Sequence, residues 1–238
     1  MIHVIPEGKT EEKVVMKILY DKQYRILKGE GKSEIAPKLR AVIVPNKAVP
    51  LRCMILRDLD AHEGETKERI RQSIQGTLQR IVRELDDGMQ KPELESMATY
   101  NNVFTAILTQ PDIRLAVHIA TYRWQDSFIK STIDDYVLAL ALRLPVVTAI
   151  KKKNWDDVEP TDIIRKVTEE IPALLKQNHI PLQEAKDYVR LYAAVMQLHT
   201  SPRVFAEKVL ANAPEKDIDD VFASLQAAVD FLGGKDVI

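Results

Sequence analysis

The segment LRCMILRDLDAHEG, residues 51–64, constrains the fold more than any other part of the chain. Its first six residues form an almost unbroken apolar run, which ends in the charged sequence RDLD and a turn that contains glycine. A short apolar run bounded by turn residues predicts a buried strand, of the kind found in parallel sheets that are covered on both faces. Loops at the carboxyl ends of such strands form the usual ligand crevice, so we expect Asp58 and Asp60 to lie there.

Asp58 and Asp60 form a candidate metal site. Residues i and i+2 of an extended segment point the same way, so the two carboxylates can reach one cation. Carboxylate oxygens are the ligands that Mg²⁺ and Mn²⁺ prefer. The alternative interpretation is a strand end that carries two solvated aspartates.

The start of the chain places another carboxylate at another strand end. The sequence IHVI, residues 2–5, predicts a short strand, and Glu7 and Gly8 follow it directly. Thr10 is expected to cap a helix with an apolar face. Glu11 falls in the first turn of that helix, where a negative charge suits the helix dipole, and this alone is a sufficient structural reason for it.

The strand that runs into EGKTEE, the helix after it and the later strand that runs into DLD together resemble the TOPRIM domain. Topoisomerases, primases and the OLD (overcoming lysogenization defect) nucleases share this domain. The EGxTE pattern is most similar to the OLD-type branch and to small stand-alone TOPRIM proteins. The resemblance covers residues 1–140. It implies an α/β fold with a TOPRIM-like (Rossmann-like), mostly parallel sheet flanked by helices, followed by a C-terminal α-helical region.

The resemblance also implies a set of metal ligands. By match to the family motifs, Glu7, Asp58 and Asp60 bind Mg²⁺ or Mn²⁺, and Glu11 matches the additional glutamate of the nuclease branch. The chain departs from full-length OLD proteins because the Walker pattern GxxxxGK[ST] is absent, so it carries no P-loop ATPase motif of its own.

A further acidic candidate lies in QDSFIKSTIDDYVLALALRL, residues 125–144, which predicts a helix. Small stand-alone TOPRIM proteins often carry an acidic residue before an aromatic residue and a run of aliphatic ones. IDDYVLAL is similar to that pattern, which implies a metal role for Asp134, with Asp135 as the alternative. Compensation of the helix dipole also explains an acidic pair at a helix start.

Composition describes an ordinary globular chain of 238 residues with 34 basic and 35 acidic side chains, and a net charge of −1. No overall basic character indicates a nucleic-acid partner, so any binding surface must be local. Residues 21–52 provide a candidate, because eight lysines and arginines there face three acidic residues. The lone Cys53 excludes an internal disulfide framework. No signal peptide or membrane span is evident, so we expect a cytoplasmic protein.

The chain changes character after the sheet region. From about residue 155 it predicts a series of amphipathic helices, several of which begin near Pro160, Pro181 and Pro202. We therefore expect a TOPRIM-like metal-binding domain over residues 1–150 and a helical C-terminal region over residues 151–238. Assembly of the chain into a homo-oligomer is compatible with these features.

These features predict a nuclease-like phosphodiester hydrolase that depends on Mg²⁺ or Mn²⁺ and acts on DNA or RNA. Asp58 and Asp60 would hold the cation, and Glu7 would be a further ligand or the general acid/base. Haloacid dehalogenase phosphatases also carry DxD, but they require Thr or Val where this chain has His62, and their motif ends the first strand. The other alternative is a non-catalytic TOPRIM interaction module that works with a separate ATPase or nucleic-acid-processing protein.

Overall fold

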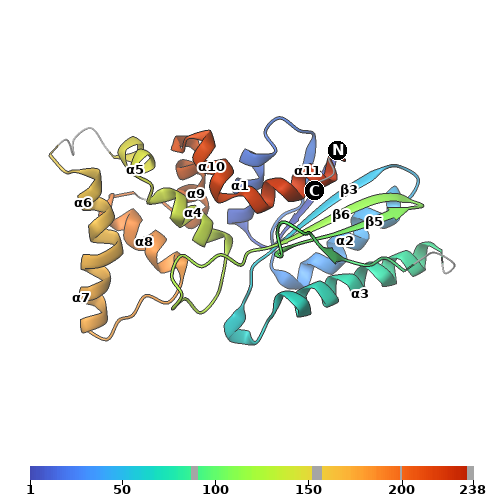
Figure 1. Cartoon of the computed structure of the whole chain (residues 1–238), viewed down its shortest axis with the longest axis horizontal. Helices are drawn as coiled ribbons and strands as arrows, with labels where there is room; N and C mark the ends of the chain where they lie inside the picture. Colours follow the sequence, from blue (N-terminus) through green and yellow to red (C-terminus); the bar gives the residue numbers. More distant parts are fainter. Residues whose placement is uncertain (87–90, 152–156, 199, 235–238) are drawn as a thin grey trace. The chain divides into compact units, whose positions relative to one another are not determined.

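A computed structural model describes residues 1–86, 91–151, 157–198 and 200–234, and it divides the chain into two compact units (Figure 1). The sheet unit consists of Met1–Thr121 and Ala223–Ile238, and the helical unit of Tyr122–Phe222. This division differs from the predicted boundary between residues 150 and 151. The chain leaves the sheet unit after Thr121, and its last helix returns to that unit.

The sheet unit contains a six-stranded, mostly parallel sheet in the order β2-β1-β3-β6-β5-β4. The strands β1, β2, β3 and β6 are parallel to one another, and β5 and β4 add an antiparallel edge. The α/β class, the mostly parallel sheet and the helical region that follows it are as predicted. The strand bounds are β1 Ile2–Pro6, β2 Tyr24–Ile26, β3 Leu51–Arg57, β4 Glu95–Ser96, β5 Val103–Thr109 and β6 Asp112–Ile119.

Strand β3 lies at the centre of the sheet, between β1 and β6. Every residue of β3 except Arg52 is buried, which explains the apolar run in the sequence. Alternate side chains of a strand point to opposite faces, and Leu51, Cys53 and Ile55 belong to the core beneath two helices. Arg57 has the same parity, so the last residue of the strand carries its charge toward the same face of the sheet as Leu51, Cys53 and Ile55.

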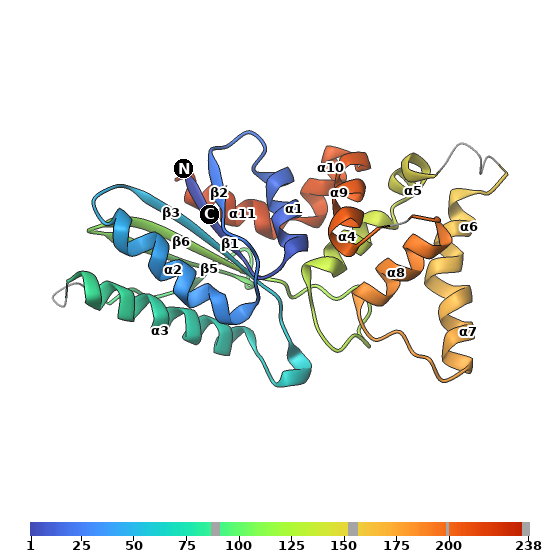
Figure 2. The same cartoon turned by 180° about the vertical axis from the view of Figure 1, so that it is seen from behind.

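Helices cover both faces of this sheet, as Figures 1 and 2 show. The helices α2 and α3 lie on one face, and α1 and α11 lie on the other. Thr10 is not the cap of α1: the helix begins two residues earlier than predicted, after the extended Gly8, and Thr10 is buried in its first turn. The bounds are α1 Lys9–Ile18, η1 Lys32–Glu34, α2 Ile35–Ile43, η2 Val44–Asn46, η3 Ala61–Glu63, α3 Lys67–Leu85 and α11 Ala223–Leu232.

The helical unit confirms most of the expected helices, and two of the expected proline starts are exact: α6 begins at Pro160 and α9 at Pro202. Around Pro172 the chain forms a run of three helical segments, in which a π-helical turn precedes the proline. The bounds are α4 Ile133–Ala141, α5 Leu144–Ile150, α6 Pro160–Arg165, η5 Lys166–Glu170, α7 Ile171–Gln177, α8 Ala185–Val195, α9 Pro202–Asn212 and α10 Glu215–Val221. Across the described parts of both units, no helix combines the length and apolar character needed to cross a membrane.

Candidate functional site at the ends of β1 and β3

The pairing of β1 with β3 brings the predicted acidic residues to one edge of the sheet. Pro6 is in register with Leu56, and the Glu7 amide donates a 3.1 Å hydrogen bond to the Leu56 carbonyl. Glu7 and Arg57, the residues that follow this pair, therefore lie at the same edge of the sheet. The Asp58 amide donates a 3.1 Å hydrogen bond to Glu7 Oε2, which joins the two strand ends through the carboxylate itself.

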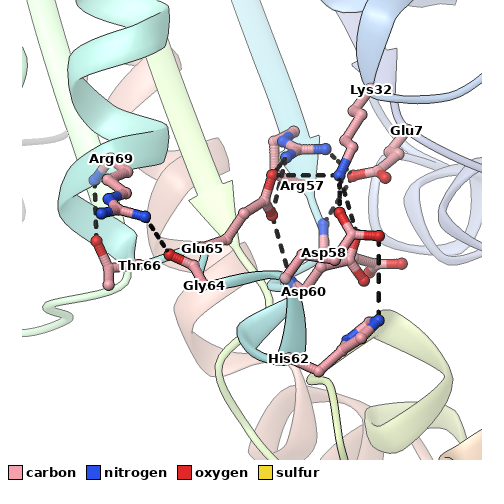
Figure 3. A network of polar contacts seen from close by, with 11 residues as sticks. Glu7, Lys32, Arg57, Asp58, Asp60, His62, Gly64, Glu65, Thr66 and Arg69 are labelled. Atoms are coloured by element: carbon pink, nitrogen blue, oxygen red, sulfur yellow. Dashed lines mark hydrogen bonds and ion pairs between the residues drawn. The ribbon is translucent and has the colours of Figure 1, made fainter.

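Arg57 holds the centre of this arrangement (Figure 3). Its side chain is only 7% exposed, and its two terminal nitrogens contact different carboxylates. One donates a short hydrogen bond to Glu7, and the other contacts Glu65 at 3.0 Å. A buried cation between two carboxylates fixes both of them, because each would otherwise be a charge removed from water.

Glu65 is a site residue that the sequence analysis missed. Its carboxylate accepts hydrogen bonds from Arg57 and, at 3.3 Å, from the Asp60 amide. Gly64 precedes it with a φ of +74°, so the turn at η3 reverses the chain and returns Glu65 to the strand end. The glycine was visible in the sequence, but the direction in which the turn sends the next residue was not.

Lys32 is the second cation among these carboxylates. Its Nζ lies 2.6 Å from Glu63 and 3.5 Å from both Asp60 and Glu65. We call this set of seven side chains the strand-end cluster; it consists of Glu7, Lys32, Arg57, Asp58, Asp60, Glu63 and Glu65.

The glycine loop KGEGK, residues 28–32, places Lys32 in the cluster. The Gly31 amide donates to the Glu7 carbonyl at 2.9 Å, and Gly31 has a φ of +99°. A Cβ on Gly29 would lie 2.4 Å from the Gly8 carbonyl oxygen, so only glycine lets the two backbones approach this closely. The loop is therefore packed directly against the segment that carries Glu7.

The cluster has an electrostatic imbalance. Five carboxylates share two cationic side chains, and the side chains of Glu7, Asp60 and Glu65 are at most about one-fifth exposed. Burial raises the pKa of Glu7 above its ordinary value, although Arg57 and the Asp58 amide oppose this change. Like charges held together out of water repel one another, and added positive charge would relieve that repulsion.

These residues fit a hard divalent cation in donor chemistry and in charge, because carboxylate oxygens with an excess of negative charge are what such ions bind. Their present arrangement differs from a finished site. Among the residues described, no three Asp, Glu, His or Cys side chains are grouped as metal ligands. Lys32 and Arg57 hold the oxygens that a cation would take, so coordination requires Lys32 to move away from Asp60.

Glu11 and Asp134 have other surroundings. Glu11 is 4% exposed in the first turn of α1, and a Cβ on Gly8 would lie 2.8 Å from its carboxylate. Asp134 belongs to the helical unit, where it is buried at the start of α4 and lies 3.7 Å from Lys186. The metal roles implied for both residues stay predictions.

Asp135, the alternative to Asp134, completes the capping box of α4. Its carboxylate accepts hydrogen bonds from the amides of Thr132 and Trp124 and from the Thr132 hydroxyl. Burial raises the pKa of Asp135 to about 6, although these hydrogen bonds oppose the change. The residue thus has a complete structural role at a helix start.

The basic segment of residues 21–52 is less positive in the structure than in the sequence. Five of its eight cations form ion pairs with acidic side chains: Lys22 with Asp21, Lys32 with Glu63, Lys38 with Glu30, Arg40 with Glu84 and Arg52 with Asp112. Three of these acidic partners, Glu63, Glu84 and Asp112, lie outside the segment, so the composition of residues 21–52 could not reveal them.

Comparison with known proteins identifies the fold but no family. No family model matches the sequence, and no curated protein matches it closely enough to count as a relative. The fold is similar to that of the hypothetical protein PH0156 from Pyrococcus horikoshii OT3, with a TM-score of 0.59 and 14% sequence identity over 98% of each chain. This likeness extends over both units, and at this identity it shows the fold alone.

Proposed function

We propose that the chain is a phosphodiester hydrolase of the TOPRIM type that acts on DNA or RNA with Mg²⁺ or Mn²⁺. The observation that carries this proposal is the strand-end cluster, where Glu7 from β1 meets Asp58 and Asp60 from β3 around too few cations. The order of the motifs along the chain, a glutamate after the first strand and DxD after β3, supports the same interpretation and its OLD-type branch.

The residues of the cluster would divide the work. Asp58 and Asp60 would hold the cation, with Glu7 as a further ligand or as the general acid/base. A bound divalent ion neutralises a phosphodiester oxygen and acidifies a water molecule. Arg57 keeps Glu7 and Glu65 in place, and Lys32, once displaced from Asp60, becomes available to a substrate phosphate.

The test compares the wild type with Asp58→Asn in nicking of plasmid DNA and cleavage of structured RNA in Mn²⁺. Asparagine keeps the shape of the side chain but removes the charge that holds the cation, so we expect activity to be lost and folding to persist. Asp112→Asn is the matched control, because Asp112 is an exposed aspartate at the start of β6 and should be dispensable.

A thermal melt with and without Mg²⁺ separates metal binding from catalysis. Ligand that binds only the folded state stabilises it by about 1.4 kcal/mol at ten times its dissociation constant. We expect this stabilisation in the wild type and in Asp112→Asn, and not in Asp58→Asn. A wild type that binds metal yet cuts neither substrate, even with candidate ATPase partners present, would favour the non-catalytic interaction module. Equal cleavage by Asp58→Asn would refute the proposed site.

A further inference from the structure

Two adjoining cavities lie between α2 and α3, on the face of the sheet that these two helices cover. The first has a volume of about 270 Å³ and reaches the strand-end cluster at Lys32, Arg57 and Glu65. The second, of about 380 Å³, continues between the same two helices toward Arg40 and Arg80. Ala36 and Thr77 line both, so the two cavities form one groove, which we call the α2–α3 groove.

The groove is apolar at its base and polar along its sides. Ile35, Leu39, Ile70 and Ile74 line the first cavity and belong to the buried core. Hydroxyl groups of serine and threonine side chains lie among them. At about 270 Å³ the cavity is just below the range of roughly 300 to 1,000 Å³ typical of drug-sized ligands, which suits a small flat group rather than a large one.

Cationic side chains outnumber carboxylates in the lining of the groove, and Arg69 and Arg80 are the two that belong neither to the strand-end cluster nor to the Arg40–Glu84 ion pair. Five cationic side chains line it, against two carboxylates; the cations are Lys32, Arg40, Arg57, Arg69 and Arg80. Glu65 binds Arg57 within the strand-end cluster, and Glu84 binds Arg40 at the far end. An apolar floor with a positive rim is complementary to a chain that has flat bases and a negative backbone.

The spacing along α3 places two arginines and two hydroxyl-bearing side chains on the face of the helix that lines this groove. Arg69, Ser73, Thr77 and Arg80 are three or four residues apart, so they lie on one face of the helix, and all of them line the groove. Arg69 donates to the Gly64 carbonyl at 2.7 Å, which holds it beside the turn of the strand-end cluster. Arg80 lies along the helix toward Gly76 and Thr77.

We propose that the α2–α3 groove binds a single-stranded segment of nucleic acid and leads it to the strand-end cluster. This proposal rests on the proposed function for the identity of the ligand. One base would occupy the first cavity among the aliphatic side chains, while phosphates would lie at Arg69 and Arg80. A duplex is excluded from this mode of binding because its bases are paired and stacked, whereas a single strand can place a base in a pocket.

Binding is measured by fluorescence anisotropy with a labelled twelve-nucleotide single strand of DNA, the same sequence as RNA, and the DNA duplex. EDTA is present throughout, so the readout does not depend on cleavage. We expect the single strands to bind more tightly than the duplex, and the comparison of DNA with RNA identifies the sugar that the groove accepts. Tighter binding of the duplex would overturn the proposal.

Two variants test the groove itself. In Arg69→Gln/Arg80→Gln two phosphate contacts are lost, so the slope of log affinity against log salt should fall by about 1.4, at about 0.7 per contact to a single strand. Ser73→Leu places a branched side chain in the first cavity and should weaken binding on the order of tenfold, the scale of one displaced base.

Controls come from the same helix. Arg83 and Gln72 are exposed on α3 and line neither cavity, so Arg83→Gln and Gln72→Leu should bind as the wild type does. If the groove variants bind the single strand as tightly as these controls, the groove is not the binding site, even when the protein cleaves nucleic acid. If they bind more weakly but the wild type cleaves nothing, the groove stands and the hydrolase proposal falls.

Discussion

Two polar clusters lie at the neighbouring strands β3 and β6, and they differ in charge. The strand-end cluster surrounds Arg57 of β3 on the face covered by α2 and α3. The other cluster surrounds His118 of β6, which pairs with Leu56, and it consists of His118, Asn102 and Ser224 of α11. The first collects charges of both signs with carboxylates in excess, whereas the second is neutral.

The neutral trio is typical of a structural role. His118 is 1% exposed, and burial lowers its pKa to about 4, so its ring is uncharged at neutral pH. It lies 3.0 Å from the Ser224 hydroxyl, and Asn102 donates to the Ile119 carbonyl at 3.0 Å. These contacts attach α11 to the sheet with no net charge. The charged cluster instead retains repulsion that a ligand could relieve.

The largest effect should follow from removing the central cation of the charged cluster. In Arg57→Gln two little-exposed carboxylates, Glu7 and Glu65, lose their partner, and breaking a buried ion pair in this way costs about 3 to 5 kcal/mol. Urea unfolding in EDTA measures the loss. Arg69→Gln, at an exposed position of α3, should cost under about 1 kcal/mol. An equal, small loss in both variants would show that Arg57 is not holding the cluster together.

The second largest effect is a pH dependence of stability that we expect from His118 of the neutral cluster. The unfolded chain protonates His118 near pH 6.5, whereas the folded protein resists protonation until about pH 4. The unfolded state therefore binds more protons between these values, so the free energy of unfolding attributable to this group falls as pH is lowered from 6.5 to 4. The shift corresponds to a loss on the order of 3 kcal/mol.

Urea unfolding of the wild type and of His118→Gln, measured at intervals from pH 4 to 7.5, tests this expectation. Glutamine retains a hydrogen-bonding group of similar reach but does not titrate, so the stability difference between the two proteins should shrink or reverse toward acid pH. A difference that stays constant with pH would mean that His118 becomes protonated as readily in the folded protein as in the unfolded chain.

The smallest effect concerns the contact between His118 and α11. Ser224→Ala removes the hydroxyl that lies 3.0 Å from the ring, and a typical hydrogen bond contributes about 1 kcal/mol net. The melting temperature of Ser224→Ala should therefore be lower than that of the wild type. Ser96→Ala, at the exposed edge strand β4, should leave the melting temperature unchanged. If Ser224→Ala melts at the same temperature as Ser96→Ala, only the apolar contacts of α11 hold it on the sheet.

The residues of the strand-end cluster differ in whether the sequence could predict their position. Asp58, Asp60 and Glu7 follow apolar strands directly, and parallel strands bring such positions to one edge, so local patterns were enough to place them together. Glu65 and Lys32 were not predicted, because each reaches the cluster through a turn or a glycine loop whose direction depends on contacts distant in sequence. The metal interpretation of the cluster stays a prediction.

Parts of the fold could also be predicted from local sequence patterns. The apolar run at Leu51–Leu56 predicted the buried strand that the structure places at the centre of the sheet. The short strands β2 and β4 were missed because two or three residues carry no period. The return of α11 to the sheet was also missed, because its apolar pattern is the same whether it packs on helices or on strands.

That return gives the protein an order of assembly. The sheet unit is discontinuous in the chain: its last helix is separated from β6 by the whole of Tyr122–Phe222. During synthesis the strands emerge first, yet the part of the sheet that α11 covers remains exposed until about one hundred further residues have been made. Early folding of the inserted helical unit would bring its two ends to fixed positions and so reduce the loop entropy of closing the sheet unit. We therefore expect the nascent chain to expose the most apolar surface in the interval between the synthesis of β6 and that of α11.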